Sequence, residues 1–297
     1  MPVNSDAVGR SVGPQTVDLD PRFLMAFAAG IGEVAPHYYD TTRPDGIIGH
    51  PVYPVSPEWD LARLSDEPLP GMETLVAGEA ALGVHYDHRI LIHRPLRGGD
   101  KVALSATLTG VEQRRSGALH LLQYEASDSN GQPLWTTIQG ALFRGVDVSG
   151  GDRRVPQAID APDRIPADAP ALQTTVVKVP YGTPHVYTEC SRIWNPIHTD
   201  EAVAIGAGLP GIILHGTATL ALAVSALLRL AGESGPERVR DLYGRFAAMV
   251  PLPDMLTVRI LADETADGRR TLRYDVRNGA GDSAIRDGQL VLAHPAT

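Results

Sequence analysis

Residues 216–230 read GTATLALAVSALLRL, and this stretch decides the fold. Its apolar positions leave no polar stripe along a helix: Leu220, Ala221, Leu222, Val224, Leu227 and Leu228. A helix that is apolar all round must be enclosed by other parts of the protein. The uncharged run 209–228 is about long enough to span a bilayer. Because Pro210, Gly211 and His215 shorten its apolar part, we expect a buried helix and not a membrane span.

Alternating segments on both sides of this helix predict a sheet that encloses it. Four segments after the helix have the period of strands: residues 244–250, 256–261, 271–276 and 288–292. Before the helix, residues 174–179 and 186–190 are predicted as strands, followed by a short helix from about Asp200. An antiparallel sheet wrapped around an enclosed helix is the hotdog arrangement, an α+β fold.

The first half repeats this order of elements. Asp20 and Pro21 predict the start of a helix over residues 20–34. Strand-like segments follow at residues 88–93, 102–111, 118–126 and 134–143. Residues 128–131 and 278–281 match as hairpin turns, and Arg94-Pro95-Leu96 resembles Val250-Pro251-Leu252. The predicted fold is therefore a tandem (double) hotdog, with antiparallel sheets each wrapped around a long central helix.

A proline-rich segment separates the two halves. Residues 148–171 contain four prolines among Asp, Ala and Gly and have no sustained apolar period, so they are predicted to be a linker. The domains expected are a hotdog unit over residues 1–147, the linker, and a second hotdog unit over residues 172–297. A length of 297 residues suits two domains of about 100 to 150 residues each.

Composition and charge exclude several classes of function. A net charge of -9 and a pI near 5.5 argue against nucleic acid, whose binding depends on clustered Lys and Arg. The single cysteine, Cys190, excludes an intramolecular disulfide framework and fits a reducing compartment. The first fifteen residues lack the apolar core of a signal peptide, so a cytoplasmic location is expected. The ten histidines show no compact ligand spacing with a carboxylate, so no metal or other cofactor is expected.

Two short segments of the second half carry the candidate chemistry: CSRIWNPIHTD at residues 190–200 and GIILHGT at residues 211–217. Asn195 and Pro196 predict a turn that presents His198 at the start of a helix. Histidine can act as acid or base near neutrality, because its unperturbed pKa is about 6.5. The backbone N–H of Gly216 is predicted at a helix N-terminus, where it could bind a developing oxyanion.

These segments resemble the MaoC-like, (R)-specific enoyl-CoA hydratase family, whose signature is D-x-N-P-[LIV]-H with a second H-G element at the start of the hotdog helix. The resemblance implies hydration or dehydration of a 2-enoyl or 3-hydroxyacyl thioester carried by CoA or by acyl carrier protein. It also implies catalytic roles for His198 and Asn195. Gly216, His215 and Thr217 are the residues expected to bind the thioester.

The chain departs from this signature at one position, because Ile193 stands where the family has its catalytic aspartate. An isoleucine cannot transfer a proton. Asp200 and Glu189 are candidates to replace the missing acid. The substitution also leaves other functions open: a hotdog enzyme of another reaction type, such as an isomerase or a thioesterase, or a non-catalytic acyl-binding subunit.

The first half is expected to supply an acyl cavity and no second catalytic set. By analogy with the fold, the two halves are predicted to pair as an internal pseudo-dimer, and self-association into a homodimer stays open. Five side chains of the first half could enter a shared cleft, and the sequence does not choose among them: His37, Tyr38, His85, Asp87 and His88.

Overall fold

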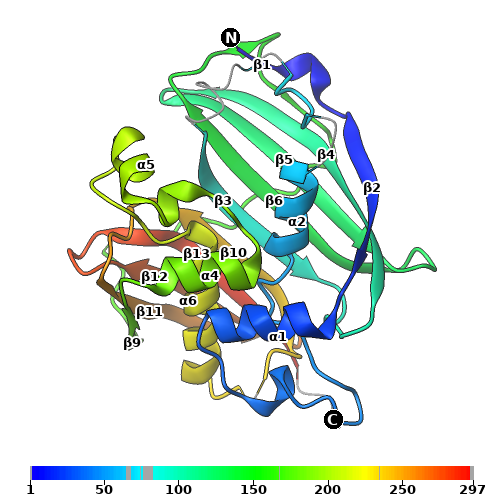
Figure 1. The fold of residues 1–297 in the computed structure, drawn as a ribbon, viewed down its shortest axis with the longest axis vertical. Helices are drawn as coiled ribbons and strands as arrows, with labels where there is room; N and C mark the ends of the chain where they lie inside the picture. The colour runs from blue at the N-terminus through cyan, green and yellow to red at the C-terminus, as the bar shows by residue number, and fades with distance from the viewer. Residues whose placement is uncertain are drawn as a thin grey trace.

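The computed structural model describes residues 2–64, 68–73, 75, 83–166, 168–233 and 235–294. Strands from both halves form one 11-stranded sheet, and Figure 1 shows the helices on one side of it. The strand order is β2-β4-β5-β6-β3-β10-β13-β12-β11-β9, with β8 paired to β4. The first half of the chain therefore supplies one end of the sheet and the second half the other.

In the described residues of the first half, the main elements are five long strands, two α-helices and a 3-10 turn. The strands are β2 (Ser11–Asp18), β3 (Gly83–Ile92), β4 (Lys101–Arg114), β5 (Gly117–Ser127) and β6 (Pro133–Arg144). The helices are α1 (Pro21–Gly30), the 3-10 turn η2 (Pro36–Tyr38) and α2 (Val55–Leu64). Short elements flank them: β1 (Val3–Asn4), η1 (Ser5–Ala7), β7 (Val148–Ser149) and β8 (Arg153–Arg154).

The second half repeats this plan with a longer central helix. Its strands are β9 (Gln173–Val179), β10 (Val239–Phe246), β11 (Asp254–Ala266), β12 (Arg269–Arg277) and β13 (Ser283–Ala293). Its helices are α4 (Thr183–Ser191), η3 (Pro196–His198), α5 (Glu201–Gly206) and α6 (Gly216–Leu230). Every residue of α6 from Thr217 to Leu228 is buried, as an all-apolar helix requires.

The two halves meet at an antiparallel strand pair. In this pair β3 lies beside β10, with Asp87 opposite Arg245 and Leu91 opposite Asp241. The pairing makes the two sheets continuous, so the halves are arranged as the predicted internal pseudo-dimer. No helix among the described residues is long and apolar enough to cross a membrane.

Most predicted elements are confirmed, and one is wrong. Residues 186–190 were expected as a strand, but they belong to helix α4, which begins just after Pro180, Tyr181 and Gly182. Alternation over five residues is too short to separate a strand from one turn and a half of helix. The sequence analysis also missed β2 and α2. The strand expected at residues 244–250 begins earlier, as β10.

The two hairpin turns have the same hydrogen bonds, which supports duplication of one unit. The Asp128 carboxylate accepts hydrogen bonds from the N–H groups of Asn130 and Gln132. The Asn278 side-chain oxygen accepts the corresponding bonds from Ala280 and Asp282. Side chains of Asp and Asn stabilise turns through such local bonds. The structure therefore confirms the hairpin assigned to each half.

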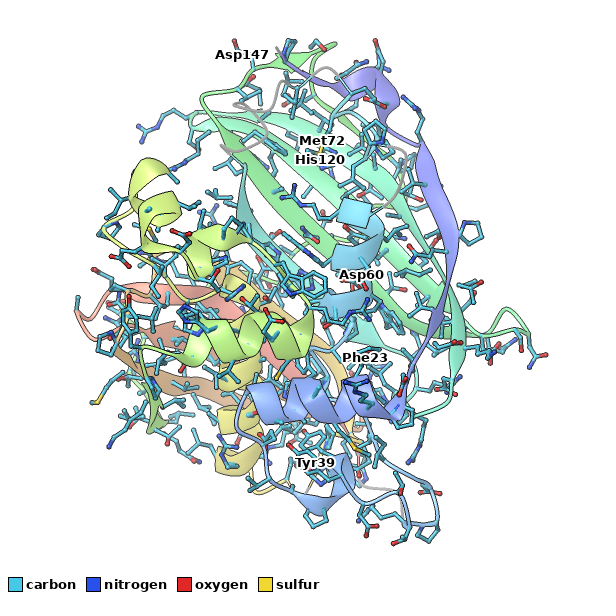
Figure 2. The ribbon with its side chains drawn as sticks, in the orientation of Figure 1. Phe23, Tyr39, Asp60, Met72, His120 and Asp147 are labelled. Carbon is cyan, nitrogen blue, oxygen red and sulfur yellow. The ribbon has the colours of Figure 1, made fainter. Side chains whose placement is uncertain are left out.

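Helices of the two halves also contact each other. A Cβ added to Gly30 of α1 would lie 2.6 Å from the Cβ of Cys190, so only glycine allows α1 to pack this closely on α4. At the end of α4, Arg192 forms a 2.6 Å ion pair with Asp60 of α2 and lies over the ring of Phe23. Figure 2 labels Asp60 and Phe23 on these two helices of the first half. These contacts fix the segment before residue 195 against the first half.

Candidate active site

The predicted turn at Asn195-Pro196 holds His198 in place. Asn195 is the N-cap of η3, and its side-chain oxygen accepts a hydrogen bond from the Ile197 N–H at 3.4 Å. Pro196 is the first residue of η3, where its fixed φ favours a helical turn. The observed contact of Asn195 is therefore a cap, and His198 is the side chain that this turn presents.

The His198 ring has one nitrogen engaged and one left for chemistry. Its Nδ1 lies 2.8 Å from the carbonyl oxygen of Ile213. A carbonyl only accepts, so Nδ1 carries the proton, and Nε2 of the neutral ring keeps its lone pair. Burial lowers the pKa of His198 to about 4, although the Ile213 carbonyl opposes this shift. The half-buried ring is therefore a neutral base at pH 7.

The ring of His215 stacks on the ring of His198. The two rings stack with centroids 3.7 Å apart and an interplanar angle of 26°. His215 is buried, and its Nε2 lies 3.2 Å from the hydroxyl of Thr188 on α4. Burial and the neighbouring His198 hold the pKa of His215 well below its usual range. The contacts of His215 are those of a neutral ring that positions His198.

Gly216 begins α6 immediately after His215. In the described part of the chain its N–H has no hydrogen-bond acceptor, as expected for the first residue of a helix. A Cβ at this position would lie 3.2 Å from the ring of Phe246, so glycine allows this ring to pack closely against the start of α6. The Thr217 hydroxyl accepts a hydrogen bond from the buried Tyr187 hydroxyl at 3.0 Å. The Gly216 N–H and the neutral His198 ring therefore both lie at the N-terminus of α6.

Two family models match the chain. A MaoC-like domain matches residues 168–283, and a FAS1-like dehydratase domain region matches residues 6–137. Residues 168–283 are therefore similar to MaoC-like domains. The first match contains the whole His198 and Gly216 site, and the second lies within the first half.

The chain is similar to enoyl-CoA hydratase ChsH3 of Mycobacterium tuberculosis, at 28% identity over 71% of this chain and 68% of that protein. It is 37% identical to the beta subunit of fatty acid synthase from Aspergillus oryzae over 35% of this chain. That match spans 5% of the subunit, so this chain corresponds to a small part of it.

Solved structures show the same fold. A MaoC-like dehydratase from Phytophthora capsici aligns over 99% of both chains with a TM-score of 0.81 and 21% identity. A Mycobacterium tuberculosis protein described as a double hotdog aligns over 96% of both chains, with a TM-score of 0.61 and 16% identity. The predicted tandem hotdog is confirmed.

The position at which the MaoC-like signature has its aspartate is apolar in this chain. Ile193 is 5% exposed and belongs to the hydrophobic core. Asp200 caps α5, with its carboxylate accepting hydrogen bonds from the N–H groups of Ala202 and Val203. Glu189 is exposed on α4. The observed contacts of both acidic candidates are therefore those of surface and cap residues.

The first half contains a degenerate copy of the same element, which the sequence analysis missed. Pro36 begins η2 as Pro196 begins η3, and this alignment places Tyr38 where the second half has His198. The matching bridges at Ile48 and Ile213 place Pro51 where the second half has Gly216. A proline has no N–H to donate. At these two positions the first half therefore has neither the imidazole nor the backbone N–H that the second half has.

Two histidines of the first half lie on the helix side of the sheet near this site. His85 Nε2 is 3.1 Å from His88 Nδ1, although the two residues are three positions apart on β3. A β-bulge between His85 and Asp87 places both rings on one face. His85 also lies beside Phe246, with ring centroids 4.7 Å apart. The sequence could not select this pair, because it does not reveal the bulge.

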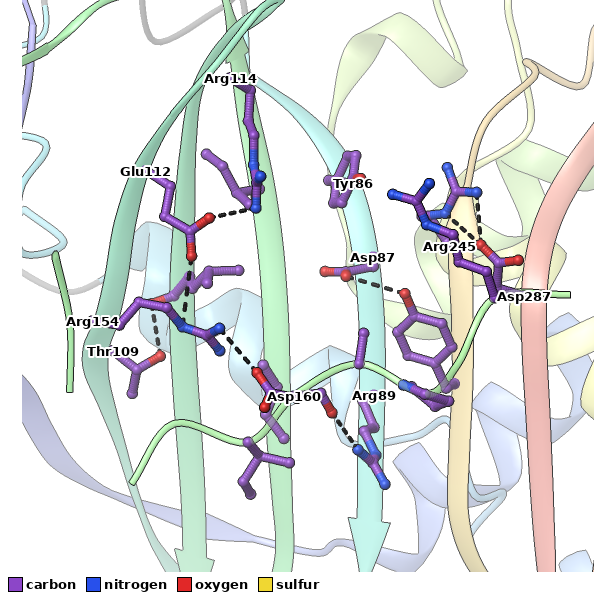
Figure 3. Close-up of a pocket in the computed structure, with 18 residues that line it drawn as sticks. Tyr86, Asp87, Arg89, Thr109, Glu112, Arg114, Arg154, Asp160, Arg245 and Asp287 are labelled. Atoms are coloured by element: carbon purple, nitrogen blue, oxygen red, sulfur yellow. Dashed lines mark hydrogen bonds and ion pairs between the residues drawn. The ribbon is translucent and has the colours of Figure 1, made fainter. Parts of the chain in front are cut away.

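Asp87 points to the opposite face of the sheet. There the Tyr243 hydroxyl donates to its carboxylate at 3.2 Å, and both residues line a cavity of about 290 Å³ beneath residues 159–164. Figure 3 shows ion pairs at this cavity, including Arg245 with Asp287 and Arg154 with Asp160. Gly244, between Tyr243 and Arg245, instead faces Leu220 of α6. This cavity is therefore on the other side of the sheet from His198.

Metal chemistry has no ligand set in the described residues, where no group of three His, Cys, Asp or Glu side chains could hold an ion. Cys190 is partly buried against Gly30, and burial raises the pKa of its thiol. Its contacts are those of a packing residue.

Proposed function

We propose that this protein hydrates 2-enoyl thioesters, or dehydrates 3-hydroxyacyl thioesters, at the His198 and Gly216 site. The observation that carries the proposal is the pairing of a neutral imidazole, with Nε2 available, and an N–H at the start of α6 that has no acceptor among the described residues. The reaction needs a base for water and donors for the charge that develops on the thioester oxygen.

The proposed chemistry assigns each group one task. His198 Nε2 removes a proton from water as the oxygen of water attacks the β-carbon. The Gly216 N–H donates a hydrogen bond to the thioester oxygen, where negative charge accumulates, with the dipole of α6 behind it. The α-carbon then receives a proton from an acid. Dehydration is the same sequence in reverse.

The substrate class follows from the relatives and from the site. The mycobacterial relative is named as an enoyl-CoA hydratase, and the fungal match is part of a fatty acid synthase. We therefore propose an acyl-CoA or acyl-carrier-protein thioester, with the first half providing the acyl cavity. The proposed domain limits are residues 1–147 and 172–297, and the cytoplasmic location expected from the sequence stays a prediction.

Crotonyl-CoA and a longer 2-enoyl-CoA test this function directly. We expect the purified protein to remove the absorbance of the conjugated enoyl thioester and to form the 3-hydroxyacyl product. A thiol reagent in a parallel reaction reports CoA release. Release of CoA without hydration would identify a thioesterase, and binding without any turnover would identify an acyl-binding subunit; either result contradicts the proposal.

The pH dependence of hydration should reflect the buried base. His198 must be neutral to accept a proton, and burial lowers its pKa to about 4. Because the neutral form predominates above the pKa, kcat/KM should fall as the pH drops through about 4 and not near the unperturbed 6.5. Initial rates measured across this pH range give the acidic limb of the profile, where kcat/KM falls. Circular dichroism at the same pH values detects any unfolding. A limb near the unperturbed value would contradict the assigned tautomer and burial.

A further inference from the structure

Three side chains of the first half, Glu58, His88 and His85, lie in a row. Glu58 lies on α2, and its Oε2 is 3.8 Å from Nε2 of His88 on β3. Nδ1 of His88 is 3.1 Å from Nε2 of His85. Glu58 and His88 are each 1% exposed, whereas His85 is half-buried. The line therefore runs from the core of the first half to a partly accessible ring.

The contacts of this line favour proton transfer along it. In the described part of the chain, neither Glu58 Oε2 nor His88 Nε2 has another hydrogen-bond partner. The other oxygen of Glu58 accepts a 2.9 Å hydrogen bond from the Trp135 indole, which fixes the carboxyl group. At 3.8 Å the two atoms are too far apart for a hydrogen bond. A buried polar atom without a partner is costly, so a small side-chain shift that joins them is favoured.

The accessible end of the line contacts Phe246, whose ring also lies against Gly216. The His85 ring is 4.7 Å from the Phe246 ring, and that ring lies 3.2 Å from where a Cβ of Gly216 would be. β3 and β10 are paired here, with His88 opposite Gly244. His85, Phe246 and Gly216 therefore line the same end of α6, on the helix side of the sheet.

We propose that His85 is the second acid/base of the thioester site, with His88 and Glu58 as the positioning residues that relay its proton. This inference rests on the proposed function. It assigns to the first half the proton transfer that Ile193 cannot perform, whereas the sequence analysis expected from that half only an acyl cavity.

The relay balances without a buried imidazolium. In hydration, His85 Nδ1 gives its proton to the α-carbon while its Nε2 takes the proton of His88 Nδ1. His88 Nε2 takes the proton of the Glu58 carboxyl group, which is left as a carboxylate held by Trp135. Both histidines begin and end neutral. Solvent then protonates His85 Nδ1 at the accessible end, and the relay runs in reverse to restore both tautomers and the Glu58 carboxyl group. Solvent also accepts the proton that His198 took from water.

The protonation states fit this direction of transfer. Burial raises the pKa of Glu58 to about 7, against the opposing effect of the Thr137 and Trp135 side chains. Burial lowers the pKa of His85 to about 4 and holds that of His88 well below its usual range. Among the described residues, the titratable groups that face Glu58 are His88 from β3 and Tyr124 from β5. Glu58 can therefore supply a proton near neutrality.

Substitutions of Glu58 and His85 test the relay by its pH profile. For the wild type, kcat/KM for crotonyl-CoA hydration should fall as the pH rises above about 7, because Glu58 then lacks its proton. Glu58→Gln keeps the shape and the Trp135 contact, and it should remove this limb and lower the rate about tenfold below it. His85→Gln should lower kcat about 100-fold. Tyr86→Phe, on the other face of β3, is the matched control and should retain the wild-type profile.

A second measurement separates the two proton transfers. In D2O, the wild type should place deuterium on the α-carbon of the 3-hydroxyacyl product, and exchange of that position in added product should slow in Glu58→Gln and His85→Gln. If both variants melt as the wild type does and keep its rate, exchange and pH profile, the relay is overturned while the proposed function stands. If the wild type itself does not hydrate the substrate, the proposed function fails and the relay fails with it.

Discussion

Replacing His198 with alanine should lower kcat/KM for crotonyl-CoA hydration by about 100- to 10,000-fold, the contribution typical of a general base. The reason is geometric, because Nδ1 is held by the Ile213 carbonyl and Nε2 is the nitrogen left to accept a proton from water. The stacked His215 cannot replace it, since that ring is buried and its Nε2 contacts the Thr188 hydroxyl. Water would then attack without a base.

The control for this substitution is His93→Ala. His93 follows the last residue of β3, is exposed, and contacts the Thr136 hydroxyl. We expect its kcat/KM to equal that of the wild type. Both variants should be compared with the wild type by thermal melting. A His198→Ala protein that folds normally and hydrates at the wild-type rate would remove His198 from the mechanism.

The fold could be predicted because its strongest signal is local. The all-apolar stretch at residues 216–230 became α6 with the expected bounds. The paired hairpin turns at residues 128–131 and 278–281 were visible as composition and have the expected bonds. In contrast, α4 was predicted as a strand at its C-terminal end, because its burial depends on α1, a helix from the other half.

The candidate site could be predicted only in part. The sequence indicated His198 and the helix start at Gly216, since a turn and a helix terminus are both encoded locally. It did not indicate the tautomer of His198, which depends on the Ile213 carbonyl fifteen residues later. The helix predicted from about Asp200 is confirmed, with Asp200 as its N-cap, whereas the sequence did not show that Glu189 faces solvent.

The sequence indicated even less about His85, His88 and Glu58 of the first half. His85 and His88 were two of several candidates, and a β-bulge decides that they share a face. Glu58 was not among them, because a lone glutamate in a short helix is usually a surface residue. Glu58 differs from a surface glutamate because it lies on the buried face of α2, against Trp135 and His88. Long-range packing therefore determines which acidic group can serve a site that lacks the family's aspartate.

Replacing Gly216 with proline should lower kcat by about 100- to 1,000-fold with little loss of folding, because it removes one oxyanion donor. Proline is tolerated at the first position of a helix. The residue before a proline must be extended, and His215 already has φ -59° and ψ 140°. The chain itself contains this arrangement, since Pro51 occupies the matching place in the first half.

The matched control for the lost N–H is Gly216→Ala. Alanine and proline both place a Cβ 3.2 Å from the Phe246 ring, so the ring must move by a few tenths of an ångström in either variant. Alanine retains the N–H, so we expect its kcat to exceed that of the proline variant by at least about tenfold. Measured kcat and KM for crotonyl-CoA, beside melting temperatures, separate the two effects. Equal kcat values in the two folded variants would mean that steric closure, and not the donor, governs this position, and the thioester oxygen would then have to be held by another group.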